Sequence, residues 1–290
     1  MKHLLCLGLG FTAATLARQL SRKEWRISGT SRRRAGVEAM ANRGVEGLLF
    51  DEMAVIPSSV THILSSVPPS DDGDPVVRKF NADLARGFDW IAYLSTTGVY
   101  GDHGGAEVDE ATPLTPASTR GARRVSAEQA WQPYHPHLFR LPGIYGPGRN
   151  QLESLREGTA KRIIKPGQLF SRIHVDDIAG VLAASMRKPD PGRAYNVADD
   201  LACPPQDVVA YAAELLGIAP PPEIPFESAN LSPMAQSFYG ESKRVSNARM
   251  KRELNYRLRF PTYREGLRDI FKNSPHLHVP PGSALPRTSV

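Results

Sequence analysis

Apolar runs of strand length alternate with helical patterns through the first half of the chain. Patterns typical of helices, such as "TAATLARQL" and "AGVEAMANRG", stand between the first of these runs. The runs lack polar alternation, which indicates strands buried on both faces of a parallel sheet. The sequence therefore predicts an α/β fold with a doubly wound parallel sheet, the Rossmann fold. The apolar runs are "HLLCLG", "WRISGT", "VEGLLF", "HILSSV", "WIAYLST" and "HLFRLPG".

The pattern changes near residue 143, at "GIYGPGRNQLESLREG", and later helices are separated by Pro-rich connections such as "IAPPPEIP". We predict a Rossmann domain over 1–148, to which about 172–200 returns. A smaller, mostly C-terminal substrate lobe is expected over 149–171 and 201–273, packed on the carboxyl ends of the strands. Residues 274–290 show no periodicity, and we expect a disordered tail there. Further helices are expected after Asp74-Pro75, over Arg120–Trp131 and over Val175–Met186.

The composition is that of an ordinary globular protein, because 41% apolar residues in 290 are ample for a core. The start of the chain is similar to a short signal peptide, but Gly8 and Gly10 interrupt its apolar run. No later stretch approaches ~18 uninterrupted apolar residues, so no membrane span is indicated. Cys6 and Cys203 lack the paired spacing of metal sites or disulfides, which favours a reducing compartment. We expect a cytoplasmic protein with no membrane partner.

The net charge of +6 and the pI of about 9.4 keep nucleic acid in view as a partner. The positive charge is divided among residues 32–34, 120–124 and 243–259, so local anion sites or a solvated face explain it more economically. A small molecule is therefore favoured over nucleic acid. His174 with Asp176 and Asp177 could be read as a metal pair, but acids at a helix start are typical of capping, and no metal is predicted.

The segment "GLGFTA" at residues 8–13 follows a predicted strand and opens a predicted helix, which is the context of a dinucleotide-binding loop. Gly8 permits the tight turn, Gly10 allows the backbone to approach a pyrophosphate, and Ala13 allows close helix packing. Phe11 and Thr12 begin the helix, whose N-terminus offers unpaired N–H donors. A Gly-rich turn without a ligand is the alternative.

The second predicted strand ends in "GTSRRR", with no acid to accept from a ribose 2′-hydroxyl. Ser31 and Arg32 offer donors suited to a 2′-phosphate, so NADP(H) is favoured over NAD(H). Arg33 and Arg34 are assigned to the solvated start of a helix. Asp51, after "GLLF", is a candidate for an adenine contact, with a solvent-facing turn as the equal alternative.

Six pieces of the chain stand in an order typical of one family. The chain resembles the extended short-chain dehydrogenase/reductases, of the sugar-nucleotide epimerase and dehydratase type, up to about residue 272. The resemblance implies NAD(P) binding, hydride transfer on a small or sugar-nucleotide-like substrate, and a monomer or homodimer. The pieces are "GLGFTA", "YLSTTGVYG" at 93–101, "PLTP" at 113–116, "FRLPGIYGPGR" at 139–149, "RIHVDDIA" at 172–179 and "YNVADD" at 195–200.

The resemblance also places individual residues. It implies a cofactor contact for the loop containing Val67 and Pro68, and another for Pro142 and Ile144. In that family the matching segments line the active site, so three residues in them are candidates for binding the substrate. A purely structural role is the alternative for each. These candidates are Tyr100, Tyr145 and Arg149.

The sequence departs from the family at its proton donor. Thr96 matches the hydroxyl that binds the reacting oxygen, but Arg120 stands where a Tyr is expected and Arg124 where a Lys is expected. A guanidinium keeps its proton, so Arg120 cannot replace a phenol as acid or base. Arg124 can still donate to the nicotinamide ribose, and the two arginines together could bind an anionic group. Two exposed helix arginines are the alternative.

A Tyr-x-x-x-Lys spacing does occur in "YGESK", at Tyr239 and Lys243. It lies more than 140 residues beyond Thr96, in the C-terminal half, so we interpret it as a coincidental match. Two hypotheses follow. One is an atypical NADP(H)-dependent oxidoreductase or epimerase whose proton donor is unassigned. The other is a catalytically inactive NADP(H)-binding sensor that has lost the phenol.

Overall fold

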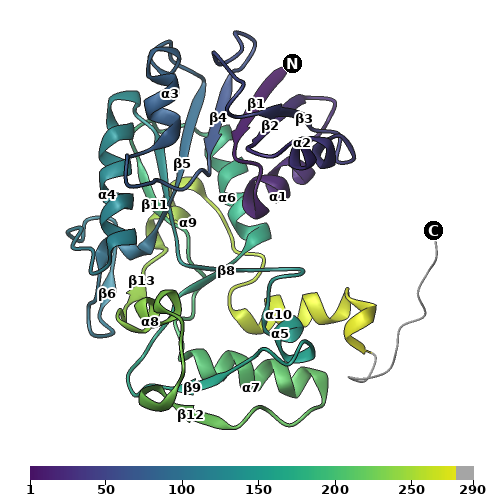
Figure 1. Cartoon of the computed structure of the whole chain (residues 1–290), viewed down its shortest axis with the longest axis vertical. Helices are drawn as coiled ribbons and strands as arrows, with labels where there is room; N and C mark the ends of the chain where they lie inside the picture. Colours follow the sequence, from purple (N-terminus) through teal and green to yellow (C-terminus); the bar gives the residue numbers. More distant parts are fainter. Residues whose placement is uncertain (279–290) are drawn as a thin grey trace.

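A seven-stranded parallel sheet forms the centre of the computed structural model, which describes residues 1–278 (Figure 1). The chain builds outward from β1 in one direction, returns, and builds outward in the other. This order confirms the predicted doubly wound sheet and places a switch point between β1 and β4. In spatial order the strands are β11 (Ala194–Asn196), β7 (His137–Leu141), β5 (Trp90–Thr96), β4 (His62–Ser65), β1 (Lys2–Leu7), β2 (Trp25–Ser31) and β3 (Glu46–Leu49).

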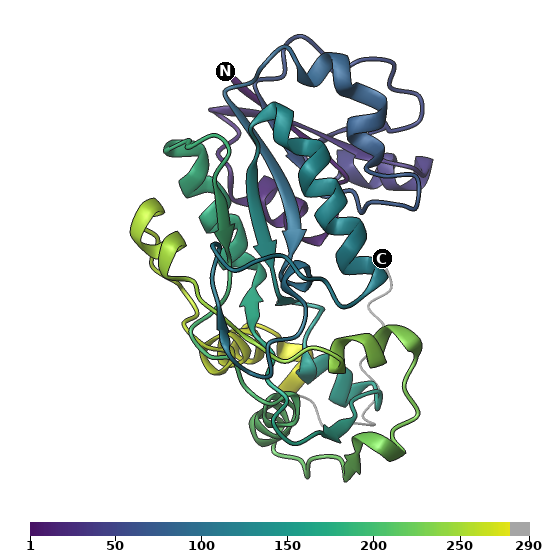
Figure 2. The same ribbon diagram turned by 90° about the vertical axis from the view of Figure 1, so that its left-hand side faces the viewer.

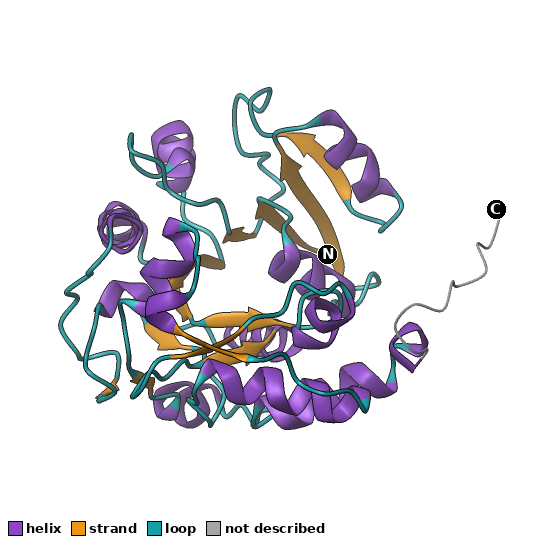
Figure 3. Cartoon of the chain, turned by 60° about the horizontal axis from the view of Figure 1, so that its bottom comes forward, coloured by secondary structure: helices purple, strands orange, loops and turns teal. Residues whose placement is uncertain are grey.

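Both faces of the sheet are buried, as the apolar runs predict. Leu4 and Cys6 belong to one core cluster, and Leu5 and Leu7 belong to another, because successive side chains of a strand point to opposite faces. Figures 2 and 3 show helices alongside the strands from two further directions. The first cluster includes side chains of α1 (Phe11–Gln19), α2 (Arg34–Ala41) and α6 (Val175–Arg187); the second includes side chains of α3 (Pro75–Leu84) and α4 (Thr119–Trp131).

A buried polar network joins α4 to the sheet. Arg140 of β7 donates to both carboxylate oxygens of Glu128, at 2.8 and 3.1 Å. The hydroxyl of Ser95 donates to Glu128 at 2.5 Å, and Arg140 also donates to the hydroxyl of Tyr100 at 2.9 Å. Tyr100 in turn donates to the side-chain oxygen of Asn196 at 2.7 Å. These bonds tie β5, α4, β7 and β11 together beneath the carboxyl ends of the strands.

The second half of the chain builds a lower part with its own core (Figure 1). That core contains Leu152, Val208, Ala212, Leu267 and other side chains of α5, α7 and α10. Because this core is separate from those of the sheet, we propose that the lower part is the predicted substrate lobe. The remaining α-helices and strands of the described chain are β6 (Glu107–Val108), β8 (Gly143–Tyr145), α5 (Gln151–Arg156), β9 (Arg162–Ile164), β10 (Arg172–His174), α7 (Pro205–Leu216), β12 (Glu223–Pro225), α8 (Pro233–Tyr239), β13 (Arg244–Val245), α9 (Ala248–Leu254) and α10 (Tyr263–Lys272).

One segment assigned to that lobe packs elsewhere. Met250 and Leu254 of α9, with Leu258 just after it, belong to the core cluster that α1 and α6 form on the sheet. The C-terminal half therefore also completes the Rossmann domain.

The expected tail begins with ordered residues. Pro275–His278 form a short 3-10 helix, and Leu277 is buried in the lower core. Residues 279–290 lie outside the described part of the chain. Over residues 1–278, no helix combines the length and the apolar character that crossing a membrane requires.

Candidate functional site

A cavity of about 560 Å³ opens at the carboxyl ends of β1, β4, β5 and β7, next to the switch point. Ligands of doubly wound sheets bind at this position. The opposite wall comes from the segment that contains α8 and the residues up to β13. The lining includes residues 10–12, 66, 94–98, 118, 120, 121, 124, 141–144, 149, 169–172, 235, 237–239, 241, 243 and 245.

Two residues of the predicted phosphate loop shape the turn without lining the cavity. Gly8 has a φ of +83°, and an added Cβ would stand 3.1 Å from the Ser66 hydroxyl. Its N–H donates to the Thr30 hydroxyl at 2.8 Å. Ala13 is fully buried in the core against the sheet. Glycine and alanine are therefore required here by backbone conformation and packing.

Gly10 is different, because nothing in the protein requires a glycine there. Its φ is −85°, which any residue adopts, and an added Cβ would meet no atom within 4 Å. Gly10 lines the cavity together with Phe11 and Thr12, at the N-terminus of α1. The open side of Gly10 is the space that a pyrophosphate would fill, so these residues fit a dinucleotide.

The residues predicted to bind the adenosine end of the cofactor lie outside the cavity. Ser31 ends β2 and accepts a hydrogen bond from the N–H of Arg33 at 3.1 Å. Arg34 is paired with Glu52 at 2.6 Å, whereas exposed Arg32 makes no ion pair within residues 1–278. Arg33 makes no ion pair within these residues either, so Arg32 and Arg33 are the arginines of this cluster whose charge no carboxylate neutralises.

Asp51 is exposed, and its main-chain carbonyl accepts from Lys79 at 2.8 Å. Val67 and Pro68 are absent from the cavity lining, while Ser66 before them is present. Pro142, Ile144 and Arg149 do line the cavity.

The three residues predicted for catalysis lie together on the cavity wall. Thr96 ends β5, and its hydroxyl accepts from the N–H of Gly98 at 3.2 Å. Arg120 lies in the first turn of α4, and Arg124 lies one turn later. Arg124 donates to the Tyr93 hydroxyl at 3.0 Å and to the Leu94 carbonyl at 2.7 Å, which fixes its guanidinium at the end of β5.

Two predicted substrate residues have structural roles instead. Tyr100 is fully buried, and both of its hydroxyl bonds belong to the Glu128–Arg140 network. The Tyr145 hydroxyl donates to the Thr262 carbonyl at 3.4 Å, and its ring packs edge-on against His174. Neither tyrosine lines the cavity, so the expected contact with a substrate is corrected to the structural alternative.

Sequence reasoning missed the opposite wall. Tyr239 ends α8 and Lys243 precedes β13, so the two do not share a helical turn, yet both line the cavity. Lys243 donates to the Gly101 carbonyl at 2.5 Å and to Glu241 at 2.6 Å. The hydroxyl of Tyr239 makes no hydrogen bond with the described residues. The two residues of "YGESK", which we interpreted as a coincidental match, thus belong to the cavity wall, although they do not form a helical Tyr–Lys pair.

His174 and Asp177 hold the start of α6. The His174 ring nitrogen Nδ1 accepts from the N–H of Asp176 at 3.1 Å, which is the capping role. Asp177 accepts from the N–H groups of Arg259 and Phe260, at 2.7 and 3.0 Å. The hydrogen bonds of Asp177 thus anchor the segment after α9 to α6.

Asp199 is 3% exposed, and its N–H donates to the carbonyl of Arg172, a residue of the cavity wall, at 2.7 Å. Its Oδ1 accepts from the N–H of Leu201 at 3.1 Å, while Oδ2 is buried without a partner. Burial raises the pKa of this carboxyl to about 8. The native protein therefore holds a proton that the unfolded chain releases above about pH 4.

We predict that Asp199→Asn, which mimics the protonated acid, removes this dependence. In the wild type, protonated Asp199 contributes its full stabilisation below the pKa of the unfolded chain. This contribution is lost as the pH rises to the folded pKa of about 8. The variant should therefore become more stable than wild type at pH 8, by an amount on the order of a few kcal/mol, and the difference should shrink at pH 5. Urea unfolding at both pH values measures this. The same difference at pH 5 and pH 8 would contradict it.

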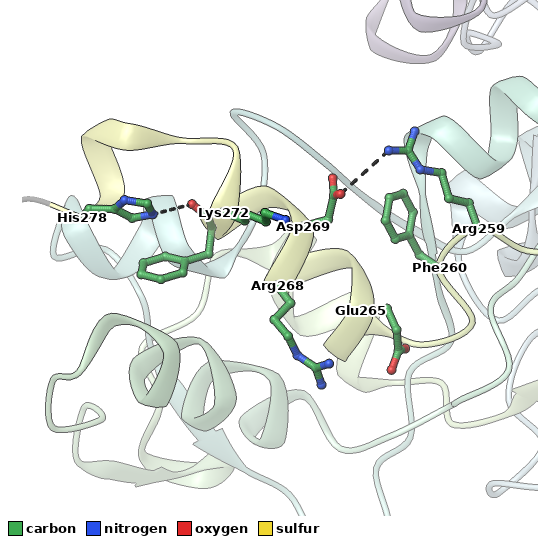
Figure 4. A pocket seen from close by; sticks show the side chains of 8 residues that line it. Arg259, Phe260, Glu265, Arg268, Asp269, Lys272 and His278 are labelled. Carbon is green, nitrogen blue, oxygen red and sulfur yellow. Dashed lines mark hydrogen bonds and ion pairs between the residues drawn. The ribbon is translucent and has the colours of Figure 1, made fainter.

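A second hollow is lined by side chains of α10 and of the segments before and after it (Figure 4). Several of its charged groups interact within the protein. Arg259 faces Asp269 at 3.8 Å, and Arg268 donates to the Tyr211 hydroxyl at 3.0 Å. The His278 ring bonds the Phe271 carbonyl at 2.8 Å. This hollow therefore offers less unpaired charge than the cavity at the sheet.

Solved structures share the fold of this chain. No family model matches it. Human epimerase family protein SDR39U1 (isoform 2) with NADPH is 17% identical and superposes with a TM-score of 0.75, covering 93% of this chain and 99% of that one. UDP-glucuronic acid 4-epimerase from Bacillus cereus, in complex with NAD, is 15% identical with a TM-score of 0.72, covering 96% and 100%. The chain thus has the fold of the extended short-chain dehydrogenase/reductases and NAD-dependent epimerase/dehydratases.

Two relatives are more similar in sequence. A functionally unknown conserved protein from Silicibacter pomeroyi DSS is 53% identical, with a TM-score of 0.89, covering 94% of this chain and 99% of that one. Protein YeeZ of Escherichia coli (strain K12) is 27% identical over 283 residues, covering 90% of this chain and 97% of its own length. The chain belongs to the same family as the Silicibacter pomeroyi protein.

Proposed function

We propose that this protein binds NADP(H) and transfers hydride to or from a small-molecule or sugar-nucleotide-like substrate, as an oxidoreductase or epimerase. The observation that carries the proposal is Gly10, which lines a cavity at the switch point and at a helix N-terminus and where an added Cβ would meet no protein atom within 4 Å. The structures of SDR39U1 with NADPH and of the Bacillus cereus epimerase with NAD support a nicotinamide cofactor. When bound, the nicotinamide would supply or accept the hydride.

Other residues of the cavity then bind and orient the substrate and the cofactor. Thr96 orients the reacting oxygen of the substrate, and Arg124, fixed by Tyr93 and Leu94, donates to the nicotinamide ribose. Pro142 and Ile144 hold the cofactor from the end of β7. Arg120 cannot exchange a proton, so it binds rather than protonates.

The preference for NADP(H) rests on Arg32, and we predict that Arg32→Ala weakens NADPH binding by about 10-fold or more. NADH binding should change little, because NADH lacks the 2′-phosphate. Fluorescence titration with each nucleotide measures both effects. Arg34→Ala is the matched control, since Arg34 is already paired with Glu52. Equal NADPH affinity in Arg32→Ala and wild type would remove the preference, and no binding of either nucleotide would remove the proposed function.

A second candidate function is an NADP(H)-binding sensor without turnover. It is favoured by Arg120 and Arg124, which stand where the family resemblance implies a phenol and an ammonium. Oxidation of bound NADPH across a panel of carbonyl compounds separates the two: tight binding without turnover supports the sensor. Cytoplasmic location and a monomeric or homodimeric state stay predictions.

A further inference from the structure

The wall of the cavity carries an excess of positive charge. Five cations against one acid give a formal charge of +4. Lys243 and Glu241 pair with each other at 2.6 Å. Over residues 1–278, none of the four arginines in the wall forms an ion pair with a carboxylate. The charged residues are Arg120, Arg124, Arg149, Arg172, Lys243 and Glu241.

Neutral groups hold these arginines in place. Arg124 donates to a hydroxyl and a carbonyl, and its Nε is buried without a partner. Arg120 lies over the ring of Phe238, with Cζ 5.6 Å from the centroid, and Arg149 lies over Phe11 at 5.9 Å. Such contacts orient a guanidinium without neutralising it. The charges are therefore positioned but uncompensated.

The arginines also act on one another. Burial, with the charges of Arg124 and Arg149, lowers the pKa of Arg120. The N-terminus of α4, a helix of 13 residues, faces the same space, because Ser118 and Gly121 line the cavity. Its dipole adds partial positive charge. An anion between these groups would relieve the repulsion.

The cofactor does not account for all of this charge. Its pyrophosphate would lie at Gly10–Thr12, beside Phe11 and therefore beside Arg149. A 2′-phosphate would lie at Arg32, outside the cavity. Arg120 on α4 is therefore left for another molecule. Arg124, one turn away, uses only Nη1 for Tyr93 and Leu94, so its guanidinium has N–H donors for a second ligand besides the one given to the nicotinamide ribose.

We infer that the second ligand of the cavity is an anion, an organic acid or a phosphate ester, whose charged group is held by Arg120 and Arg124. Its assignment as the substrate rests on the proposed function, whereas the anion site itself does not. Carboxylate and phosphate oxygens both suit the planar donors of a guanidinium.

Isothermal titration with potassium malonate and potassium phosphate, at ionic strength held constant with KCl, tests this inference. The titrations use the full chain, both free of cofactor and saturated with NADPH. We expect at least one anion to bind both forms, and Arg120→Gln to weaken that binding by about 10-fold or more. Tighter malonate binding identifies an organic acid, and tighter phosphate binding identifies a phosphate ester. Arg123→Gln is the matched control, because Arg123 lies on the same helix outside the cavity lining and contacts Asp71.

Thermal melts of both variants establish that they are folded. The inference is overturned if neither anion binds, if Arg120→Gln binds as wild type does, or if the anion only displaces NADPH from the pyrophosphate position. Loss of NADPH binding with anion binding intact would remove the proposed function and leave the anion site standing.

Discussion

Arg140→Met is expected to lower the free energy of unfolding by about 3–5 kcal/mol, because it leaves the Glu128 carboxylate buried and unpaired. Arg140 and Glu128 are 7% and 3% exposed, and their two hydrogen bonds are joined to Ser95 and Tyr100. Removing the cation therefore disturbs several partners at once. Urea unfolding of the variant and wild type measures the loss.

Two further variants show whether burial is the cause. Arg140→Met combined with Glu128→Gln should recover part of the loss, since no buried charge remains. Arg26→Met removes a cation from a comparable pair with Glu46, but those side chains are 47% and 45% exposed, so we expect a loss below about 1 kcal/mol. If Arg140→Met and Arg26→Met cost the same, the network does not anchor α4 as described.

Gly10→Ala is expected to weaken NADPH binding by about 10-fold or more while changing the free energy of unfolding by less than about 1 kcal/mol. The added methyl group meets no protein atom, but it occupies the space assigned to the pyrophosphate. NADPH fluorescence titration and urea unfolding of the same preparation measure the two effects.

Gly8→Ala is the contrasting variant. Its φ of +83° and the nearby Ser66 make an alanine strained, so this change should lower stability by about 1–2 kcal/mol or more. Unchanged NADPH affinity in Gly10→Ala would mean that the loop does not receive a dinucleotide.

The sheet could be predicted from the sequence because burial on both faces leaves a local pattern. Leu4 and Leu5 fall in different core clusters, and the run around them is apolar without alternation for that reason. The start of α3 was also readable, since Asp74 accepts from the N–H groups of Val76 and Val77 as a capping residue does.

The candidate site was only half predictable. Thr96 and Tyr100 lie four residues apart in one motif, but the 3-10 turn of Thr97–Tyr100 sends the tyrosine into the core while Thr96 reaches the cavity. Tyr239 is distant in sequence and still lines the same cavity. The tertiary packing of loops decides whether such a side chain reaches the cavity, and the pattern of apolar and polar residues in the sequence gives no sign of that packing.

The return of the C-terminal half to the Rossmann core affects how the chain folds during synthesis. When residue 148 leaves the ribosome, β7 is still an open sheet edge, because β11 (Ala194–Asn196) has not been made. The face of α6 that receives Met250 and Leu254 stays uncovered for longer still. The Rossmann half of the chain therefore cannot mature as an early, independent unit. Its completion depends on contacts distant in sequence, which slow folding and leave apolar edges open to chaperones while translation continues.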